Sequence, residues 1–495
     1  MHVCVLLPDY STSNVDYQHY DPPRDLSVLL PGDVVDTVFL NKLTTYKQLK
    51  ALQQKGYDIF VNLCEGYLEW EVPSIDVIYT LELLNLPFTG PTTLLYDPPK
   101  ELMKYVAYCA GVATPAYLLV TDVEQIENGL HSCLSPSVLP LPFPAPTPLG
   151  EGWGEVLPSL HFPLFVKPAK AGDSLGIDTF SLVNDKQQLQ AKVALLLQEY
   201  DELLVEEYIA GREFTVMIAA NADGKTCTTF KPVEYIFPEG DSFKTYSLKT
   251  SVLHPNANIP CNDIEVEQSL RDAATAIFKG FNGVGYARLD FRMDAAGKLY
   301  FLEINFTCSV FYTNGYEGSA DYILQHDGYG QQRFLQHIIA EGMARHQRKQ
   351  QKFAVKGNAI AGYGIFATQA IAAKGLVFEG EGKAQRIVTK SFVDKHWSEA
   401  EKKVFGQYAY PIGGDVYVLW SDNPSEWAPQ NHSCNANTAY EGLNAYATRD
   451  IAKGEELTLD YSTFLDSTME PFQCTCGSAN CKGLVQGRML EAARQ

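Results

Sequence analysis

The stretch GVGYARLDFR (residues 283–292), followed after a short turn by LYFLEIN (residues 299–305), decides how the first part of this chain folds. Apolar and polar side chains alternate along both runs, so we expect a β-hairpin. The alternation puts Arg288 and Asp290 on one face of the first strand, and Glu303 and Asn305 on one face of the second. Oxygen ligands of this kind suit Mg²⁺, which completes its shell with water and phosphate. The plainer interpretation is the solvent side of an antiparallel sheet.

A lysine at a strand end is the second pattern. The run LFVKP (residues 164–168) predicts a strand that carries Lys167, and the glycine-containing loop AKAGDSLG (residues 169–176) follows it. Such a lysine can hold phosphate oxygens while loop N–H groups close over them, although the pattern alone often marks only a tight turn. Further on, Glu206 and Glu213 lie seven residues apart around a turn. Their carboxylates could accept hydrogen bonds from the amino and ribose hydroxyl groups of a nucleotide.

Around these motifs the chain has mixed α and β character. Apolar runs alternate with helix-like segments over residues 1–96, which predicts a small α/β domain with a parallel sheet. Seven prolines fall within residues 135–158. Proline at that density excludes helix and central strand, so the segment is a surface loop or spacer, or alternatively a ligand for an aromatic-lined groove of a partner.

Over residues 1–345 the chain resembles the ATP-grasp fold and, within it, the D-alanine–D-alanine ligases. The resemblance implies an N-terminal α/β domain at residues 1–96 and an ATP-grasp domain at residues 97–345 with a proline-rich insertion. The matching elements occur in family order: NLCEG (62–66), LPFTG (86–90), Lys100, AGVATP (110–115), Lys167, the loop to Gly176, Glu206, Glu213, Lys249, Arg288, Asp290, Glu303 and Asn305.

The resemblance also implies roles for these residues. Lys100 and Lys167 would hold ATP phosphates, Glu206 and Glu213 adenine and ribose, and Asp290, Glu303 and Asn305 Mg²⁺, while Lys249 and Arg288 would stabilise the transferring phosphoryl group and the tetrahedral intermediate. A carboxylate would be phosphorylated to an acylphosphate and then attacked by an amine. Cationic side chains and Mg²⁺ would offset the charge that accumulates at each step.

Departures from the family pattern concern the substrate. The loop after the metal asparagine reads FTCSVF (residues 306–311), and Asp173 replaces a serine that contacts substrate in the family. The N-terminal histidine, serine and glutamate signature for the first D-alanine is not evident. We therefore expect another amino acid or a peptide as substrate.

Four motifs follow in the last part of the chain: GYGIF (362–366), NHSCNAN (431–437), GEELTLDY (454–461) and CTCGSANC (474–481). Two glycines in the first would let the backbone approach a cofactor closely. A tetrahedral zinc site needs four ligands, and the last motif offers three cysteines. Cys434 supplies a fourth beside Cys474, Cys476 and Cys481, unless all four are free buried thiols.

These motifs resemble the SET domain (residues 353–466) and the post-SET zinc segment (residues 467–495) of protein lysine methyltransferases, with Ala436 in place of the usual proline. The resemblance implies a mostly β SET domain with a zinc-binding tail, so the whole chain is α/β and α+β multidomain. By resemblance, Gly362, Tyr363, Gly364, Asn431 and His432 contact S-adenosylmethionine, and Tyr461 is the catalytic tyrosine. The tyrosine would orient the deprotonated lysine amine of a protein substrate.

Composition sets the wider expectations. Before Phe353 the chain carries 26 Lys/Arg against 43 Asp/Glu, and from there on 13 against 16. The acidity favours solubility, disfavours nucleic acid, and could attract cationic substrates. No stretch is apolar for the length of a membrane span, and the scattered cysteines favour a reducing compartment, so we expect a cytoplasmic protein. Ligases of this type are often dimers, so the resemblance leaves a homodimer open.

Three interpretations of the whole chain stay open from the sequence. Both parts could be active enzymes. Alternatively, a methyltransferase could carry a ligase-like part that only binds a nucleotide or substrate. The third interpretation, a scaffold with decayed sites, is disfavoured by the intact set of phosphate, ribose and metal candidates.

Overall fold

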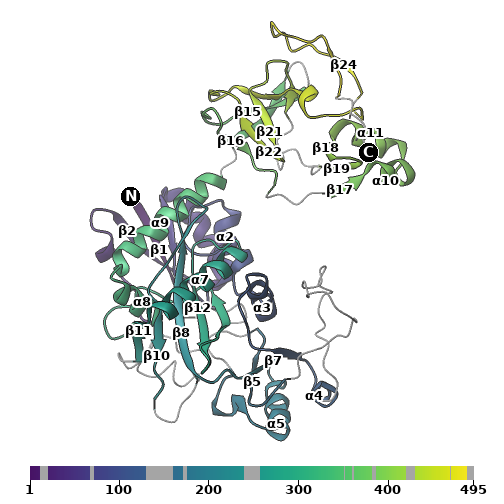
Figure 1. The fold of residues 1–495 in the computed structure, drawn as a ribbon. Coiled ribbons are helices and arrows are strands. Elements are labelled where there is room, and N and C mark those ends of the chain that lie inside the picture. The colour runs from purple at the N-terminus through teal and green to yellow at the C-terminus, as the bar shows by residue number, and fades with distance from the viewer. Residues whose placement is uncertain are drawn as a thin grey trace. The chain divides into compact units, whose positions relative to one another are not determined.

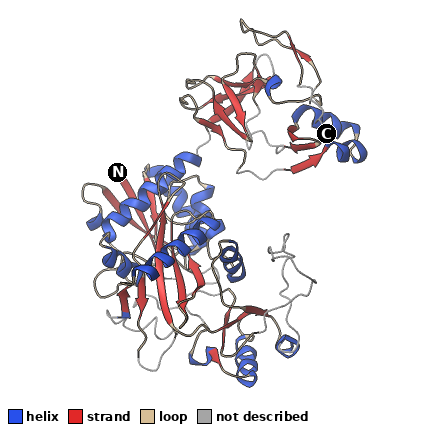
Figure 2. Cartoon of the chain, in the orientation of Figure 1, coloured by secondary structure: helices blue, strands red, loops and turns tan. Residues whose placement is uncertain are grey.

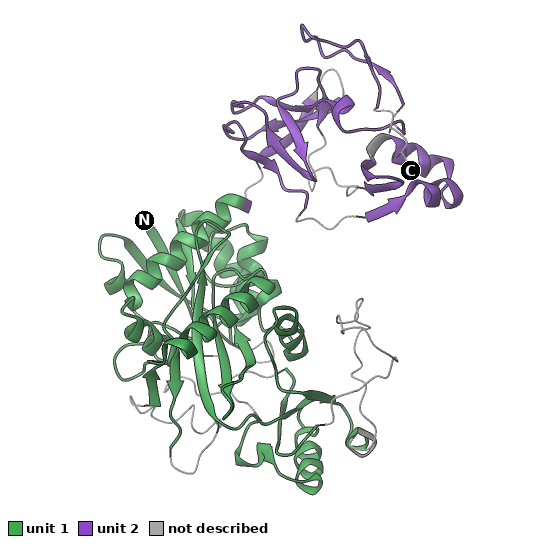
Figure 3. Cartoon of the chain, in the orientation of Figure 1, with its two compact units in different colours: residues 1–348 green, residues 349–495 purple. Residues whose placement is uncertain are grey.

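The computed structural model divides the chain into two compact units, Met1–Arg348 and Lys349–Gln495 (Figure 3). It describes residues 1–11, 21–66, 72–129, 160–170, 176–238, 243, 257–349, 352–358, 362–381, 386–419, 430–468 and 470–487. Three features singled out in the sequence lie outside the described residues: the proline-rich segment, Asp173 and Lys249.

The first unit begins with a three-stranded parallel sheet, as the sequence predicts. Its central strand is buried on both faces and is therefore apolar without alternation. One face packs with the helices α1 and α2, and the other joins the core of the larger sheet that follows. The elements are β1 (His2–Pro8) between β2 (Val34–Leu40) and β3 (Ile59–Asn62), with α1 (Thr45–Leu52) and α2 (Ile75–Leu83).

The larger sheet has six antiparallel strands in the order β11-β10-β8-β12-β13, with β9 beside β8 (Figure 1). Residues that alternate along β8 divide between two cores: Phe214 and Val216 pack with α3 and α7, whereas Met217 and Ala219 pack with β1, β3, α8 and α9. The elements are α3 (Lys100–Cys109), β8 (Arg212–Ala220), β9 (Cys227–Thr229), β10 (Val233–Tyr235), β11 (Asn258–Pro260), α7 (Ile264–Gly280), β12 (Tyr286–Met293), β13 (Leu299–Asn305), α8 (Ser319–Asp327) and α9 (Gly330–Lys349).

A four-stranded antiparallel sheet in the order β4-β7-β5-β6 completes the first unit. It has its own apolar core, closed by α4 and α5. The predicted strand before Gly176 is β5, and Lys167 lies near its end. The elements are β4 (Tyr117–Val120), α4 (Glu124–Gly129), β5 (Leu164–Pro168), β6 (Leu182–Val183), α5 (Lys186–Leu196) and β7 (Leu203–Glu207).

The second unit is rich in short strands, in keeping with the prediction of a mostly β domain (Figure 2). They form the small sheets β14-β15-β23-β20, β16-β22-β21, β17-β19-β18 and β24-β25. The strands are β14 (Phe353–Asn358), β15 (Gly362–Ala367), β16 (Leu376–Phe378), β17 (Arg386–Thr389), β18 (Tyr410–Gly413), β19 (Val416–Leu419), β20 (Asn431–His432), β21 (Thr438–Glu441), β22 (Asn444–Ala447), β23 (Glu456–Leu459), β24 (Phe472–Gln473) and β25 (Leu484–Val485), and the helices are α10 (Lys390–His396) and α11 (Glu399–Tyr408).

Among the residues that the structure describes, none of the helices combines the length and the apolar character needed to span a bilayer.

Candidate functional site

The predicted hairpin forms and brings its polar side chains together. Strands β12 and β13 pair antiparallel, with Arg288 opposite Asn305 and Asp290 opposite Glu303. Two carboxylates directly across a strand pair repel each other, so this pair favours a cation between or beside them. Two cations are already near: Lys100 Nζ lies 3.6 Å from Glu303 Oε2, and Arg288 Nε lies 3.4 Å from Asp290 Oδ1.

Glu206 lies at the centre of a buried cluster of three charges. Its carboxylate accepts a hydrogen bond from Lys104 Nζ (2.7 Å), and Lys167 Nζ lies 2.5 Å from its other oxygen. The three residues are 3%, 2% and 7% exposed, and they come from β7, α3 and β5. Burial opposes ionisation of Glu206, but the two ammonium groups outweigh it and hold the pKa of the carboxyl at about 2. Two ammonium groups against one carboxylate leave a net positive charge for an anion.

Glu213 is held by an arginine on the neighbouring strand. Arg292 lies opposite Glu213 in the β8–β12 pairing and donates to its Oε2 from Nε (3.1 Å) and Nη2 (3.0 Å). Arg292 Nη1 also donates to the Ile209 carbonyl (2.8 Å), and the guanidinium lies 4.6 Å from the Tyr208 ring centre. This buried pair joins the main sheet to the turn between β7 and β8.

The loop after Asn305 is tied to the parallel sheet. Ser309 Oγ donates to Glu65, just beyond β3, and Arg24 bonds both Glu65 Oε1 (3.3 Å) and the Val310 carbonyl (3.1 Å). Burial raises the pKa of Glu65 to about 7, although the Arg24 charge opposes the rise. The loop at residues 306–311, whose sequence departs from the family pattern, is therefore held by a second polar network, formed with Arg24 and Glu65.

In the second unit, an asparagine connects three strands. Asn431 Nδ2 donates to the Tyr363 carbonyl (2.8 Å) on β15 and to Glu456 Oε1 (2.9 Å) on β23. A Cβ at Gly364 would lie 2.3 Å from Glu456 Oε1 and 2.9 Å from Asn431 Nδ2, so a side chain there would displace the groups that hold Asn431. Gly362 has φ +82°, and a Cβ on it would meet nothing within 4 Å, which leaves open space beside the backbone.

His432 and Tyr461 are held in contact. The Tyr461 backbone N–H donates to His432 Nδ1 (3.1 Å), and the ring centres are 5.4 Å apart. The Tyr461 hydroxyl donates to the Gln430 carbonyl (2.6 Å). Because that proton is committed to Gln430, the hydroxyl oxygen keeps its lone pairs for another donor. Phe464 and Phe472 lie edge-on to the Tyr461 ring and surround it with apolar surface.

The four cysteines predicted to bind a metal gather in one place. Cys434, Cys474, Cys476 and Cys481 have all their sulfur atoms within 4.8 Å of one another, and the Sγ atoms of Cys434 and Cys474 are 3.8 Å apart. Zinc–thiolate bonds of about 2.3 Å in a tetrahedron require sulfurs about 3.8 Å apart. The tail is also held without metal, since Asn480 Nδ2 donates to the Cys434 carbonyl (3.2 Å) and Lys482 Nζ to Asp460 (2.6 Å).

Comparison with known sequence families agrees with this division. Residues 151–313 match the family described as D-ala D-ala ligase C-terminus, and residues 362–462 match the SET domain. Each part of the chain is therefore similar to one of these families, and we call the two parts the ligase region and the SET domain after the family that each matches. The resemblance predicted from the sequence is thereby confirmed for both parts.

Curated relatives of the ligase region include D-alanine–D-alanine ligases. The enzyme of Streptococcus thermophilus (strain CNRZ 1066) is 28% identical over 228 residues, which cover 46% of this chain and 57% of the relative. That of Geobacillus thermodenitrificans (strain NG80-2) is 28% identical over 278 residues, or 54% of this chain and 66% of the relative. The matched region thus spans less than two thirds of the length of these relatives.

Solved structures of D-alanine–D-alanine ligases also align with the chain. The enzyme from Coxiella burnetii has 17% identity and a TM-score of 0.47, covering 70% of this chain and 95% of that structure. The Bacillus anthracis enzyme complexed with ATP has 17% identity and a TM-score of 0.45, covering 71% of this chain and 100% of that structure.

The sequence predictions for the ligase region omit two residues that the structure places among the predicted ones. Lys104 follows Lys100 by four residues, a spacing that puts both on one side of a helix and could have revealed it. Arg292 follows Asp290 by two residues in a run that was already predicted to be a strand. Lys249, predicted to be catalytic, lies outside the described residues.

Two residues of the SET domain are likewise absent from the predictions. Glu456 accepts from Asn431, and Gln430 supplies the carbonyl that fixes the Tyr461 hydroxyl. Glu456 belongs to the quoted GEELTLDY motif, and Gln430 directly precedes NHSCNAN. Polar residues inside or directly beside the quoted motifs were therefore the signal that could have revealed them.

Proposed function

We propose that this chain carries two enzymes: an ATP-dependent carboxylate–amine ligase, and an S-adenosylmethionine-dependent protein lysine N-methyltransferase. The observation that best supports the ligase is the cluster in which Lys104 and Lys167 share one carboxylate while Lys100 approaches Glu303. A buried cluster with excess positive charge beside paired carboxylates fits a triphosphate and its metal ion.

Lys100 and Lys167 are the proposed phosphate ligands. Their ammonium groups now face Glu303 and Glu206, so phosphate oxygens would compete with carboxylates that already fix the lysine positions. Such prior fixation reduces the reorganisation needed when negative charge arrives. For Glu206 the proposed adenine contact uses lone pairs beyond those that Lys104 and Lys167 occupy, since a carboxylate offers about four acceptor sites.

Asp290, Glu303 and Asn305 fit Mg²⁺ by their chemistry. All three offer oxygen ligands, and the two carboxylates stand directly opposite each other across the hairpin. Asn305 Oδ1 accepts from the Thr307 backbone N–H (2.8 Å) and from the Thr307 hydroxyl (3.3 Å), which fixes the amide orientation. A metal ion would replace the longer contact with the hydroxyl. When bound, Mg²⁺ would neutralise the charge of the phosphates.

The proposed ligase reaction has two steps. A substrate carboxylate oxygen attacks the γ-phosphorus of ATP and ADP leaves, which gives an acylphosphate. A neutral amine then attacks the acyl carbon, the C–O bond to phosphate breaks, and the nitrogen releases a proton, so that an amide and inorganic phosphate result. Arg288, together with Lys249, is proposed to stabilise the negative charge in both steps. The altered loop from Phe306 to Phe311 supports an amino acid or peptide other than D-alanine as substrate.

An ADP-release assay tests the ligase. Purified protein with ATP and Mg²⁺ is mixed with single amino acids and dipeptides, and stimulated ADP release together with a condensation product is expected for at least one combination. Efficient synthesis of D-alanyl-D-alanine would contradict the substrate proposal. Tight ATP binding without any stimulated turnover would instead support the alternative, a methyltransferase with a nucleotide-binding module.

For methyl transfer, the contacts of Asn431 and the open space at Gly362 support a cofactor site formed by Gly362, Tyr363, Gly364, Asn431 and His432. S-adenosylmethionine would supply a methyl group on a sulfonium. Tyr461 would accept a hydrogen bond from the lysine amine through the hydroxyl oxygen, because its proton is bound to Gln430. The amine would then be oriented toward the methyl carbon.

The cysteine cluster fits zinc. Four thiol sulfurs within 4.8 Å of one another would together form a closed structural site, with no position left for catalysis. The contacts of His432 support this assignment. Its Nδ1 accepts from the Tyr461 backbone N–H, so the ring proton lies on Nε2. Nε2 lies 3.3 Å from Cys434 Sγ and can donate to the thiolate that a zinc ion would bind. Cys434, Cys474, Cys476 and Cys481 would hold the metal and fix the tail beside Tyr461.

The methyltransferase is tested with labelled S-adenosylmethionine. Purified protein is incubated with a cell lysate, and label is sought on lysine side chains by mass spectrometry. Labelled lysine in a protein is the expected result. Label confined to small molecules would contradict the assignment of a protein lysine substrate.

A further inference from the structure

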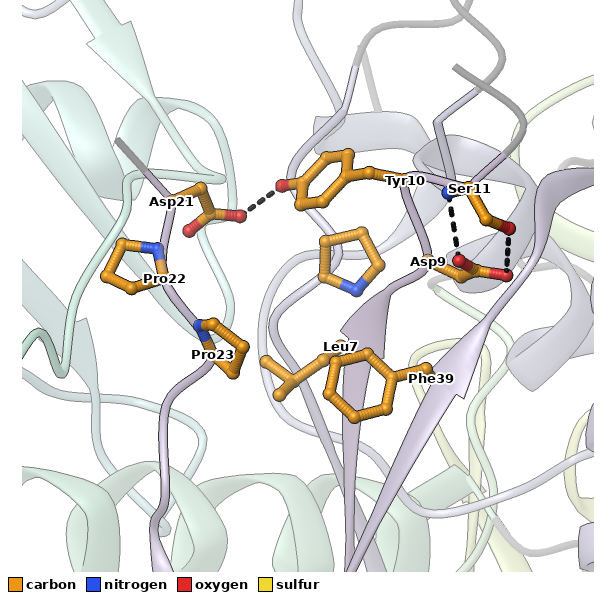
Figure 4. Close-up of a pocket in the computed structure, with 9 residues that line it drawn as sticks. Leu7, Asp9, Tyr10, Ser11, Asp21, Pro22, Pro23 and Phe39 are labelled. Atoms are coloured by element: carbon orange, nitrogen blue, oxygen red, sulfur yellow. Dashed lines mark hydrogen bonds between the residues drawn. The ribbon is translucent and has the colours of Figure 1, made fainter. Parts of the chain in front are cut away.

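A pocket of about 400 Å³ lies at the carboxyl ends of β1 and β2 in the parallel sheet (Figure 4). In open parallel α/β sheets, ligands characteristically bind in crevices at this end of the strands. The volume is within the range of about 300–1,000 Å³ that is usual for small-molecule sites. No residue that carries the predicted ligase or methyltransferase chemistry lines it.

The walls of the pocket are mainly apolar. Figure 4 shows Leu7 and Phe39 together on one side, Pro22 and Pro23 on another, and the Tyr10 ring above them. Phe39 is 47% exposed although it is a large aromatic side chain at a strand end. Side chains of this kind bind an aliphatic or aromatic group by excluding water from it.

Two carboxylates give the pocket its polarity. Asp9 accepts from the Ser11 backbone N–H (2.9 Å), from the Ser11 hydroxyl (2.9 Å) and from Asn41 Nδ2 (3.2 Å), which are all uncharged donors. Asp21 accepts from Tyr10 and, at 2.8 Å, from Tyr312. Asp9 therefore retains a negative charge that a ligand ammonium group could neutralise.

Hydrogen bonds connect this pocket to the ligase hairpin. Tyr312, which bonds Asp21, follows Asn305 by seven residues, and Arg24 joins Asp21 (3.3 Å) to the Val310 carbonyl (3.1 Å). Ser309 in the same loop bonds Glu65. A ligand in the pocket would thus contact side chains that position the loop after the proposed metal ligand.

We propose that this pocket binds the amino end of the ligase substrate: a primary ammonium group next to an apolar or aromatic side chain, in a free amino acid or in the first residue of a peptide. The ammonium would pair with Asp9, and the side chain would lie between Phe39, Leu7 and the prolines. The role as substrate site rests on the proposed ligase function, whereas binding to the pocket requires no turnover.

Calorimetric titration of the full chain without ATP measures binding directly. The probes are D- and L-phenylalanine, the dipeptide phenylalanylalanine, glycylalanine and N-acetylphenylalanine. We expect phenylalanine or its dipeptide to bind at least tenfold more tightly than glycylalanine, which lacks the side chain, and N-acetylphenylalanine, which lacks the charge. Preference for the dipeptide over phenylalanine identifies a peptide as the source of the ligand, and the reverse identifies a free amino acid.

Variants with matched controls locate the binding. Asp9→Asn keeps an acceptor for Ser11 but removes the charge, and Asp25→Asn is its control, because Asp25 accepts from Ser27 in the same way (2.9 Å) on the surface outside the pocket. Phe39→Ala removes the apolar wall, and Leu43→Ala, at a residue 73% exposed and outside the pocket, is its control. We expect each pocket variant to bind the probes about tenfold more weakly than the wild type, and each control variant to bind them as tightly as the wild type.

The outcomes separate this proposal from the ligase proposal. Binding that depends on Asp9 and Phe39 without any ADP release supports the pocket and contradicts the ligase. ADP release whose KM is unchanged in both pocket variants supports the ligase and contradicts the pocket. If none of the probes binds, or if the pocket variants bind like their controls, the proposal is wrong.

Discussion

The two candidate sites are built from different interactions. In the ligase region the central side chains are charged and already paired with one another: Lys104 and Lys167 with Glu206, Lys100 with Glu303, and Arg292 with Glu213. In the SET domain, Tyr461 and Asn431 donate to backbone carbonyls, and Asn431 also donates to Glu456. Ion pairs position the groups expected to meet phosphate, whereas hydrogen bonds of uncharged side chains position the groups expected to meet S-adenosylmethionine and the lysine amine. The sites should therefore fail under different perturbations.

Loss of Lys167 should have the largest effect and should be confined to the ligase. Lys167→Ala removes a proposed phosphate ligand and one of two partners of buried Glu206, so substrate-stimulated ADP release should fall by about 10²–10³-fold. Exposed Lys225→Ala is the control and should change neither activity. Equal loss of methyl transfer in Lys167→Ala would show that the two regions do not act separately.

Tyr461→Phe should have the converse effect. Without the hydroxyl, the lysine amine loses its proposed acceptor, so methyl transfer should fall by about 10²-fold while S-adenosylmethionine affinity changes little. Tyr446→Phe, in β22 of the same unit, provides the control. Unchanged turnover of Tyr461→Phe with labelled cofactor would remove this tyrosine from the mechanism.

Removal of zinc should have a smaller effect than either substitution, and this effect should be confined to the SET domain. We expect one zinc per chain by elemental analysis, lost in Cys474→Ser and after treatment with a zinc-selective chelator. Because His432 lies between Cys434 and the Tyr461 amide, hydrogen exchange around Tyr461 should quicken when zinc is lost. ADP release with excess Mg²⁺ should stay the same. If the backbone amides around Tyr461 exchange as slowly in the zinc-free protein as in the zinc-bound protein, zinc does not help to position Tyr461.

Lowering the pH should give the smallest effect, a loss of the stability that the ion pairs of Glu206 contribute. The pKa of Glu206 is about 2 in the folded chain against an ordinary value of 4.5, so its stabilising contribution is present above pH 4.5 and is lost as pH falls toward 2. Between pH 4.5 and 3.5 the first unit should lose about 1 kcal/mol more stability in the wild type than in Glu206→Gln. Hydrogen exchange of β5 and β7 peptides measures this, with exposed Glu199→Gln as a control that keeps the wild-type slope.

The sequence predicted the elements that depend on local periodicity. Alternation located both strands of the hairpin and the facing positions of Asp290 and Glu303, and the apolar run at residues 3–7 located the first parallel strand. Motif spacing located the four cysteines, because zinc chemistry demands four ligands and the tail offers three. Among these predictions, the placement of Cys434 beside the tail joined segments 40 residues apart, and the number of ligands that zinc needs supplied that link.

Contacts between remote segments that no metal chemistry links could not be predicted. Lys104 and Glu206 are 102 residues apart in the chain, and Asp21 and Tyr312 are 291 residues apart. A single sequence shows that such residues are charged or polar, but it does not show which of them share a partner. The pocket beside Asp9 and Phe39 likewise arises only when the ends of β1 and β2 lie side by side.

The most direct test of two separate enzymes on one chain is a single incubation followed by mass spectrometry. Purified protein, ATP, Mg²⁺, labelled S-adenosylmethionine and cell lysate are combined, and parallel reactions contain Lys167→Ala or Tyr461→Phe. Two kinds of product are expected: an ATP-dependent amide that disappears only with Lys167→Ala, and labelled protein lysine that disappears only with Tyr461→Phe. Absence of either product from the wild-type reaction, or loss of both in one variant, would contradict the account.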